Sequence, residues 1–269
     1  MGISTETTMM KLISGIDMPP SARIQWKSAE SRAEWEPIIK QAVQAYNVAE
    51  LETVRHGWRR CTTMHFNPNS MTEDINKLKG LAYLPITRVG CYQGFAHRHP
   101  AVESGKPWNY YGVVGKTAED AWDFVEATRV GDHGKMGDLL GYPKCCQEFF
   151  STVWMAGFID PVWQAAEKTE GAKIAGNTVG ISSSTLFDGL RYIGVRMVPH
   201  LPCSFSCKES QEISDRWGEL PGMQNTYYLL SLPTTWSCLN GLAIVSTPHF
   251  QVVTNSNPCN PIHIVEMGL

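Results

Sequence analysis

The segment GYPKCCQEFF (141–150) constrains the fold more than any other part of the chain, because it places two adjacent cysteines at a predicted helix start. Tyr142 precedes a proline and is therefore disfavoured in the helical region. Pro143 suits the first position of a helix, which puts Cys145 and Cys146 in the first turn. Unpaired backbone N–H groups and the helix dipole in that turn favour the thiolate, the form of cysteine that binds metals.

A second cysteine segment, HLPCSFSCKESQE (200–212), repeats this arrangement. Ser206 and Glu209 have the spacing of a capping box, so we expect Cys207 to be the first residue of another helix. Cys203 lies four positions earlier, in a predicted loop. Together the two segments predict one site with four ligands: Cys145, Cys146, Cys203 and Cys207.

The adjacency of Cys145 and Cys146 favours an iron–sulfur cluster, [4Fe-4S] in particular, over a single zinc ion. Zinc sites normally draw cysteine pairs from C-x2–4-C spacings, and we expect adjacent residues to reach one small ion only under strain. The irons of a cluster are spread out, so neighbouring thiolates can reach different irons. Zinc is the alternative cofactor. A third hypothesis is a metal-free vicinal dithiol that cycles to a strained, redox-active disulfide.

Three segments carry a resemblance to known proteins: GYPKCCQEFF (141–150), HLPCSFSC (200–207) and WSCLNGLAIVSTPHF (236–250). Together they resemble a family of uncharacterised proteins with paired G-Y-P-x-C-C-x-x-F-F and P-C-S-x-x-C motifs. The adjacent cysteines are also similar to those of [4Fe-4S] proteins of the heterodisulfide-reductase type and of epoxyqueuosine reductases. The family resemblance implies that the two cysteine segments form one site, and that Trp236 belongs to the same unit.

Composition narrows the classes of function. The chain has 269 residues and a net charge of −3, so we expect neither nucleic acid nor a membrane surface as a partner. No apolar run approaches the roughly 20 residues of a membrane span, and the first residues lack a signal-peptide pattern. We therefore expect a cytoplasmic protein whose eight cysteines stay reduced.

Hydrophobic periodicity predicts an α+β fold, with a helical central region flanked by β-rich N- and C-terminal parts. Helices are expected at 28–54, 71–79, 117–129, in pieces over 132–170, at 182–194 and at 206–220. Strands are expected at 59–66, 83–95, 110–115 and 195–201, and in a hairpin over 242–253. We divide the chain into an irregular segment (1–27), an N-terminal α/β part (28–130) and a cysteine-motif part (131–269), the last two forming one compact unit.

Several residues outside the cysteine set are candidates for the site. His200 precedes the second cysteine pair and is a candidate general acid, or the end of a strand. Trp236 and Tyr142 are expected to line a substrate pocket. Cys259 and His263 form a C-x3-H spacing that would add a ligand, although a solvated loop explains it equally well.

A second metal site is conceivable at His65 and the HRHP loop (97–100), although histidines in a polar loop are more often surface residues. The isolated cysteines Cys61, Cys91 and Cys238 are expected to pack in the core, because free cysteine behaves as a small hydrophobe.

The sequence therefore predicts an iron–sulfur enzyme that converts a small molecule at an open iron of a [4Fe-4S] cluster. No C-x3-C-x2-C radical signature is present, which favours sulfur transfer, elimination or redox conversion by a lyase, transferase or oxidoreductase. His200 and Trp236 are the candidate catalytic residues, and an electron-donor protein is an expected partner. The alternatives are a zinc-stabilised binding or structural protein and a metal-free vicinal-dithiol oxidoreductase.

Overall fold

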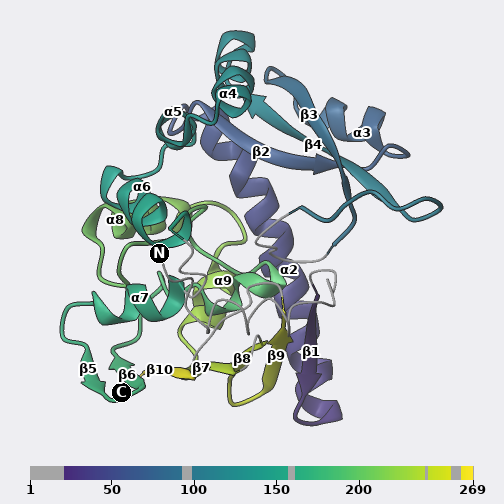
Figure 1. Ribbon diagram of the computed structural model, residues 1–269. Helices are drawn as coiled ribbons and strands as arrows, with labels where there is room; N and C mark the ends of the chain where they lie inside the picture. The colour runs from purple at the N-terminus through teal and green to yellow at the C-terminus, as the bar shows by residue number, and fades with distance from the viewer. Residues whose placement is uncertain (1–20, 93–98, 157–160, 240–241, 256–261, 269) are drawn as a thin grey trace, which may run out of the picture.

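The computed structural model describes residues 21–92, 99–156, 161–239, 242–255 and 262–268. It confirms the α+β class, with strands near both ends of the chain and helices in the middle (Figure 1). Within these ranges, none of the helices combines the length and the apolar character that a membrane span requires.

The larger sheet has seven strands among the described residues, in the order β1-β9-β8-β7-β10-β6-β5. Neighbouring strands are antiparallel except β10 and β6, which are parallel. The bounds are β1 (Ala22–Trp26), β5 (Lys173–Ala175), β6 (Thr178–Ile181), β7 (Thr234–Leu239), β8 (Leu242–Ser246), β9 (Phe250–Thr254) and β10 (His263–Met267). The hairpin predicted over 242–253 is confirmed as β8 and β9.

Strand β1 corrects the expectation that residues 1–27 are irregular, as far as that segment is described. Ile24 pairs with Val252, so the first described strand lies at the edge of the sheet built by the C-terminal hairpin. The five residues of β1 alternate between half-buried and exposed. So short an alternation is a weak signal in the sequence, and the pairing partner lies more than 200 residues away.

The smaller sheet consists of β2 (Cys61–Phe66), β4 (Trp108–Gly115) and β3 (Ala82–Gly90), all antiparallel, in that order. These strands and the short helix α3 (Met71–Lys77) agree with the predicted elements. The long helix α2 (Ala29–Arg55) runs from the small sheet at the top of Figure 1 to the large sheet at the bottom.

Helix α2 begins where the sequence predicted. The Ser28 hydroxyl accepts a hydrogen bond from the Ser31 backbone N–H at 3.1 Å, which satisfies one of the unpaired donors of the first turn. Trp35, Ile39 and Tyr46 lie on the buried face of the helix. That stripe packs into the main core, which the large sheet and the central helices share.

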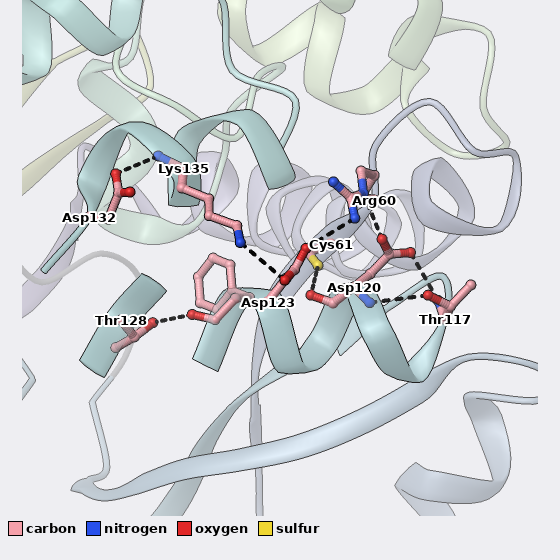
Figure 2. Close-up of polar contacts among 9 residues, drawn as sticks. Arg60, Cys61, Thr117, Asp120, Asp123, Thr128, Asp132 and Lys135 are labelled. Atoms are coloured by element: carbon pink, nitrogen blue, oxygen red, sulfur yellow. Dashed lines mark hydrogen bonds and ion pairs between the residues drawn. The ribbon is translucent and has the colours of Figure 1, made fainter. Parts of the chain in front are cut away.

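Helix α4 (Ala118–Val130) begins where the helix over 117–129 was predicted, and Thr117 and Asp120 form a capping box there. Figure 2 shows that Asp120 also accepts a hydrogen bond from Arg60, at the start of β2, at 2.6 Å. Asp123, one turn later, binds both Arg60 and Lys135 at 3.3 and 3.0 Å. These contacts of Asp120 and Asp123 anchor α4 to the small sheet and to helix α5 (His133–Leu139).

The centre of the chain is helical in several pieces, as expected for 132–170. The elements after α5 are α6 (Lys144–Phe149), a π-helical turn (Phe150–Trp154), α7 (Pro161–Glu167), a 3-10 turn (Gly189–Ile193), α8 (Lys208–Gly218) and α9 (Gln224–Leu230).

Two expectations for this region are wrong. The helix predicted at 182–194 is reduced to the 3-10 turn, and the strand predicted at 195–201 is irregular backbone. Val195, Met197 and Val198 are buried in the main core, which explains the strand-like apolar pattern. Pro199 and Pro202 have no backbone N–H to donate to a neighbouring strand, so this stretch is a poor sheet former.

Candidate metal centre

Cys145 and Cys146 occupy the first turn of α6, as the sequence predicted. Pro143 is the N-cap and not the first helical residue, so the helix begins one residue later than expected, and the Pro143 carbonyl accepts a hydrogen bond from the Cys146 N–H at 3.0 Å. Cys146 is almost fully buried, whereas Cys145 is half-buried. The adjacent thiols therefore point to different depths of the same site.

The second pair lies at the start of α8, but the predicted capping box there is wrong. Cys207 is the N-cap itself, and Ser206 accepts a hydrogen bond from the backbone N–H of Glu170 at 2.8 Å. Cys203 lies in the preceding loop, where its backbone N–H donates to the sulfur of Cys146 at 3.4 Å. The loop and the helix start thus close over the first turn of α6.

The four sulfur atoms form one compact group. Cys145 Sγ lies 3.7 Å from Cys207 Sγ and 3.9 Å from Cys146 Sγ, and Cys146 and Cys207 are also 3.9 Å apart. All four, with Cys203 included, lie within 4.8 Å of one another. Among the described residues this is the one cluster of three or more cysteine, histidine or acidic side chains that could hold a metal ion.

These separations match the coordination sphere of a single ion. Metal–sulfur bonds of about 2.3 Å in a tetrahedron place neighbouring sulfur atoms about 3.8 Å apart. A [4Fe-4S] cluster carries each thiolate on a different iron, which separates the sulfur atoms by about 6 Å. The separations among Cys145, Cys146 and Cys207 are therefore close to those expected around one ion.

Two buried polar side chains, Ser210 and His200, form a hydrogen-bonded series that ends at Cys146, the most buried of the four cysteines. The Ser210 hydroxyl lies 3.3 Å from Cys146 Sγ and 2.8 Å from His200 Nε2. Ser210 is fully buried and His200 is 8% exposed. Partners of this kind orient ligands and tune their basicity in metal sites. His200 is therefore linked to the cysteine group through Ser210 and makes no direct hydrogen bond to a sulfur among the described contacts.

The four thiols differ in acidity. A hydrogen bond with Cys146 and further bonds with Ser210 lower the pKa of Cys207 to about 4. Desolvation, followed by hydrogen bonding with Cys207, raises the pKa of Cys145 to about 12. The Cys207 hydrogen bond and desolvation raise the pKa of Cys146, and desolvation raises that of Cys203. Since metals bind thiolates, binding an ion here must displace protons.

An acidic side chain and a groove adjoin the group on its exposed side. Glu209 Oε2 lies 3.5 Å from Cys145 Sγ. A cavity of about 350 Å³ is lined by Cys145 and Cys203 together with Phe149 and Lys168. The Lys168 ammonium lies 5.0 Å from the centre of the Phe149 ring. A small molecule can therefore approach the sulfur group from this side.

The other residues expected at the site have different places. Trp236 is fully buried in β7 between Val245 and Val265 of the neighbouring strands, and Figure 1 shows β7 well apart from α6 and α8. Tyr142 donates a hydrogen bond to the Pro199 carbonyl at 3.3 Å, and its ring lies 5.2 Å from that of His200. Neither residue lines the groove.

The remaining candidates are scattered. His263 begins β10 and stacks on Trp163 at 4.0 Å, while Cys259 lies outside the described residues. His65 and His99 are near each other, with ring centres 5.6 Å apart, while His97 lies outside the described residues. No third metal-binding side chain joins His65 and His99 within the described ranges.

The isolated cysteines give mixed results. Cys61 and Cys238 are buried, as expected. Cys91 is exposed just past the end of β3, so the expectation of core packing is wrong for it. Cys238 is disulfide-bonded, so the expectation that all eight cysteines stay reduced does not hold for this residue.

Sequence reasoning missed Ser210 and Glu209 as members of the site. Both follow Cys207 closely, but the expected capping box assigned Glu209 to the backbone of Ser206 and left Ser210 without a role. If the N-cap had been predicted at Cys207, Ser210 would have been expected on the side of the helix that faces the preceding loop.

Comparison of the chain with protein-family models, with curated proteins and with solved structures gives no match. The family resemblance of the two cysteine motifs thus stays a prediction. The compact group of four cysteines, which could hold a metal ion, is the finding on which a function can be built.

Proposed function

We propose that this protein binds one tetrahedrally coordinated metal ion, Zn²⁺ in the first place, through Cys145, Cys146, Cys203 and Cys207. The observation that carries this proposal is the sulfur spacing of 3.7 to 3.9 Å among Cys145, Cys146 and Cys207, with Cys203 completing a group that spans no more than 4.8 Å. Four thiolates suit soft or borderline ions such as zinc and iron, and zinc takes this geometry without a preference of its own.

The ion would act as a cross-link between segments that are distant in the chain. It would join the first turn of α6 to the start of α8 and to the loop at Cys203. Structural zinc contributes about 10–16 kcal/mol of apparent binding energy in small domains, and this energy favours the folded state. A zinc-stabilised binding protein is therefore the function that the sulfur spacing supports best.

An iron–sulfur enzyme acting on a small molecule is the second candidate. It is favoured by the groove of about 350 Å³ beside Cys145 and Cys203, which gives access to the sulfur group. His200 would then act only through Ser210, and an electron-donor protein would be required for redox chemistry. The sulfur atoms would have to move about 2 Å further apart to hold [4Fe-4S], which makes this candidate weaker than a single ion.

Elemental analysis with a visible absorption spectrum, on protein purified under anaerobic conditions, tests the proposal. We expect about one zinc per chain, no colour, and a lower melting temperature after removal of the ion with a chelator. A brown protein containing iron and acid-labile sulfide would overturn the single-ion proposal in favour of a cluster. A metal-free protein whose thiol count falls by two on mild oxidation would favour the dithiol oxidoreductase.

A further inference from the structure

A second feature of the molecule, independent of the cysteine group, is a cavity of about 790 Å³ between α2 and the small sheet. Its volume lies within the range of about 300–1,000 Å³ that is usual for sites binding small molecules. The walls combine charged groups, tyrosines and histidines, and none of the four cysteines belongs to them.

Arg196 is the cation in this wall that has no acidic partner. Its guanidinium lies over the ring of Tyr46, 4.5 Å from the ring centre. Its Nε is buried without a hydrogen-bond partner, and no carboxylate in the described part of the chain lies within ion-pair distance of it. Arg196 as a whole is half-buried, so its charge is partly desolvated at the cavity wall and would be favoured by a counter-charge there.

Glu50, a carboxylate whose charge acts on Arg196, already has other partners. The Glu50 carboxylate pairs with Arg59 and accepts a hydrogen bond from the Thr62 hydroxyl. It also accepts one from the Tyr46 hydroxyl at 2.5 Å. The charge of Glu50 is therefore largely balanced by Arg59, and Arg196 adds a positive charge to the cavity.

The other cations of the wall are paired locally. Arg55 lies 2.5 Å from Glu52, and Lys77 lies 2.9 Å from Asp74. Desolvation lowers the pKa of His65, so this ring is neutral near pH 7. The positive field inside the cavity thus comes chiefly from Arg196.

Aromatic rings form the wall on the side of the small sheet. Tyr111 has its ring centre 4.3 Å from that of His99 and 5.3 Å from that of His65. The Tyr92 hydroxyl lies 3.5 Å from His65 Nε2. The charge of Arg196 acts on Tyr92, since it opposes the rise in the Tyr92 pKa that burial causes. Cation and rings therefore face one space.

We propose that this cavity binds a small aromatic molecule that carries a carboxylate or phosphate group. The oxyanion accepts hydrogen bonds from the Arg196 guanidinium, which is suited to bidentate contact with planar or tetrahedral oxyanions. The ring packs among Tyr92, His99 and Tyr111, whose faces favour offset or edge contacts with another aromatic group. The site requires no metal and no residue of the cysteine group.

Titrations of the full-length protein with benzoate, phenyl phosphate, benzyl alcohol and inorganic phosphate, followed by NMR, test the proposal. We expect at least one of the two aromatic anions to bind about tenfold more tightly than benzyl alcohol and inorganic phosphate, a difference worth about 1.4 kcal/mol. The preferred anion identifies the oxyanion that the site takes. Equal binding of benzyl alcohol, or tighter binding of inorganic phosphate, would overturn the proposal.

Two variants locate the binding. Arg196→Gln should weaken binding of the preferred anion by about tenfold or more, whereas Arg88→Gln should not, because Arg88 stacks on Trp108 outside the cavity. Retained affinity in R196Q would contradict the assignment.

Val48→Trp provides an independent test if R196Q unfolds. Val48 lines the cavity and is 53% exposed, so a larger side chain there blocks the entrance without touching the cation. Gln44→Trp, on the exposed side of the same helix, is the matched control. V48W should lose binding at an unchanged melting temperature, and full binding in V48W would place the ligand elsewhere.

Discussion

The sulfur atoms of Cys145 and Cys207 lie 3.7 Å apart, although the two residues are 62 positions apart in the chain. This contact brings the first turn of α6 against the N-cap of α8. Because each thiol lies at a helix start, the unpaired N–H groups of both helices favour negative charge in the same place. The relationship explains why four cysteines from two segments can form one centre.

Replacing Cys146 with serine should remove the ion. Cys146 is the deepest sulfur and lies 3.9 Å from two of the other three. We expect metal affinity to fall by at least about 100-fold and the melting temperature to fall with it, measured by elemental analysis and calorimetry. Cys91→Ser is the control, because Cys91 is exposed and lies outside the group. A C146S protein with full metal content would rule out Cys146 as a ligand.

Replacing Glu209 with glutamine should strengthen metal retention in acid. The carboxylate lies 3.5 Å from Cys145 Sγ, where its charge opposes formation of the thiolate. We expect the pH at which half of the ion is lost to move down by roughly half a unit. Glu212→Gln, on an exposed part of the same helix, should leave the midpoint unchanged. An upward shift in E209Q would mean that the carboxylate assists binding.

Replacing Ser210 with alanine should weaken the centre without removing a ligand. The variant loses the hydroxyl that contacts both Cys146 Sγ and His200 Nε2. A loss of about 10–100-fold in metal affinity is expected, measured by competition with a chelator of known affinity. Ser214→Ala is the matched control, because Ser214 is equally buried one turn later and bonds Thr185 instead. Equal losses in both variants would indicate a general effect on α8.

The stability of the protein should fall in mild acid because of His200. Burial, followed by the charge of Arg59, lowers the pKa of His200 to about 3. The unfolded chain therefore takes up this proton first, and stability is lost as pH falls below the ordinary histidine pKa of about 6.5.

From pH 7 to pH 5 this group should contribute a loss of roughly 2 kcal/mol in the free energy of unfolding, measured with urea. His200→Gln keeps a hydrogen-bonding partner for Ser210 and should reduce the loss by that amount. An identical pH dependence in H200Q would show that His200 is not kept neutral by the fold.

The sequence allowed much of the fold to be predicted, where local signals were strong. The caps at Ser28 and Thr117 fixed the starts of α2 and α4, since a cap depends only on the next few residues. Residues 195–201 were misread because burial in an irregular segment produces the same apolar run as a strand. The pairing of β1 with β9 depends on a partner that no local pattern reveals.

The ligand set of the candidate site could be predicted, but its geometry could not. The chemistry of Cys145 and Cys146 is local, whereas the distance from either sulfur to Cys207 depends on how α6 packs against α8. Adjacency therefore suggested a cluster, whereas the sulfur spacing is the basis of the single-ion proposal. The cavity at Arg196 was not predicted: His65 and the HRHP loop stood out only as a metal site, and the other lining residues come from α2, α3, the small sheet and a loop without a shared motif.

X-ray absorption at the edge of the bound metal tests the central claim most directly, since it reports the atoms around the ion in the intact protein. We predict one zinc ion with four sulfur neighbours at about 2.3 Å and no second metal nearby. An iron edge with an iron neighbour at about 2.7 Å would reveal a cluster and contradict the single-ion account. A zinc shell of nitrogen and oxygen atoms would contradict it equally, because the four cysteines would then not be the ligands.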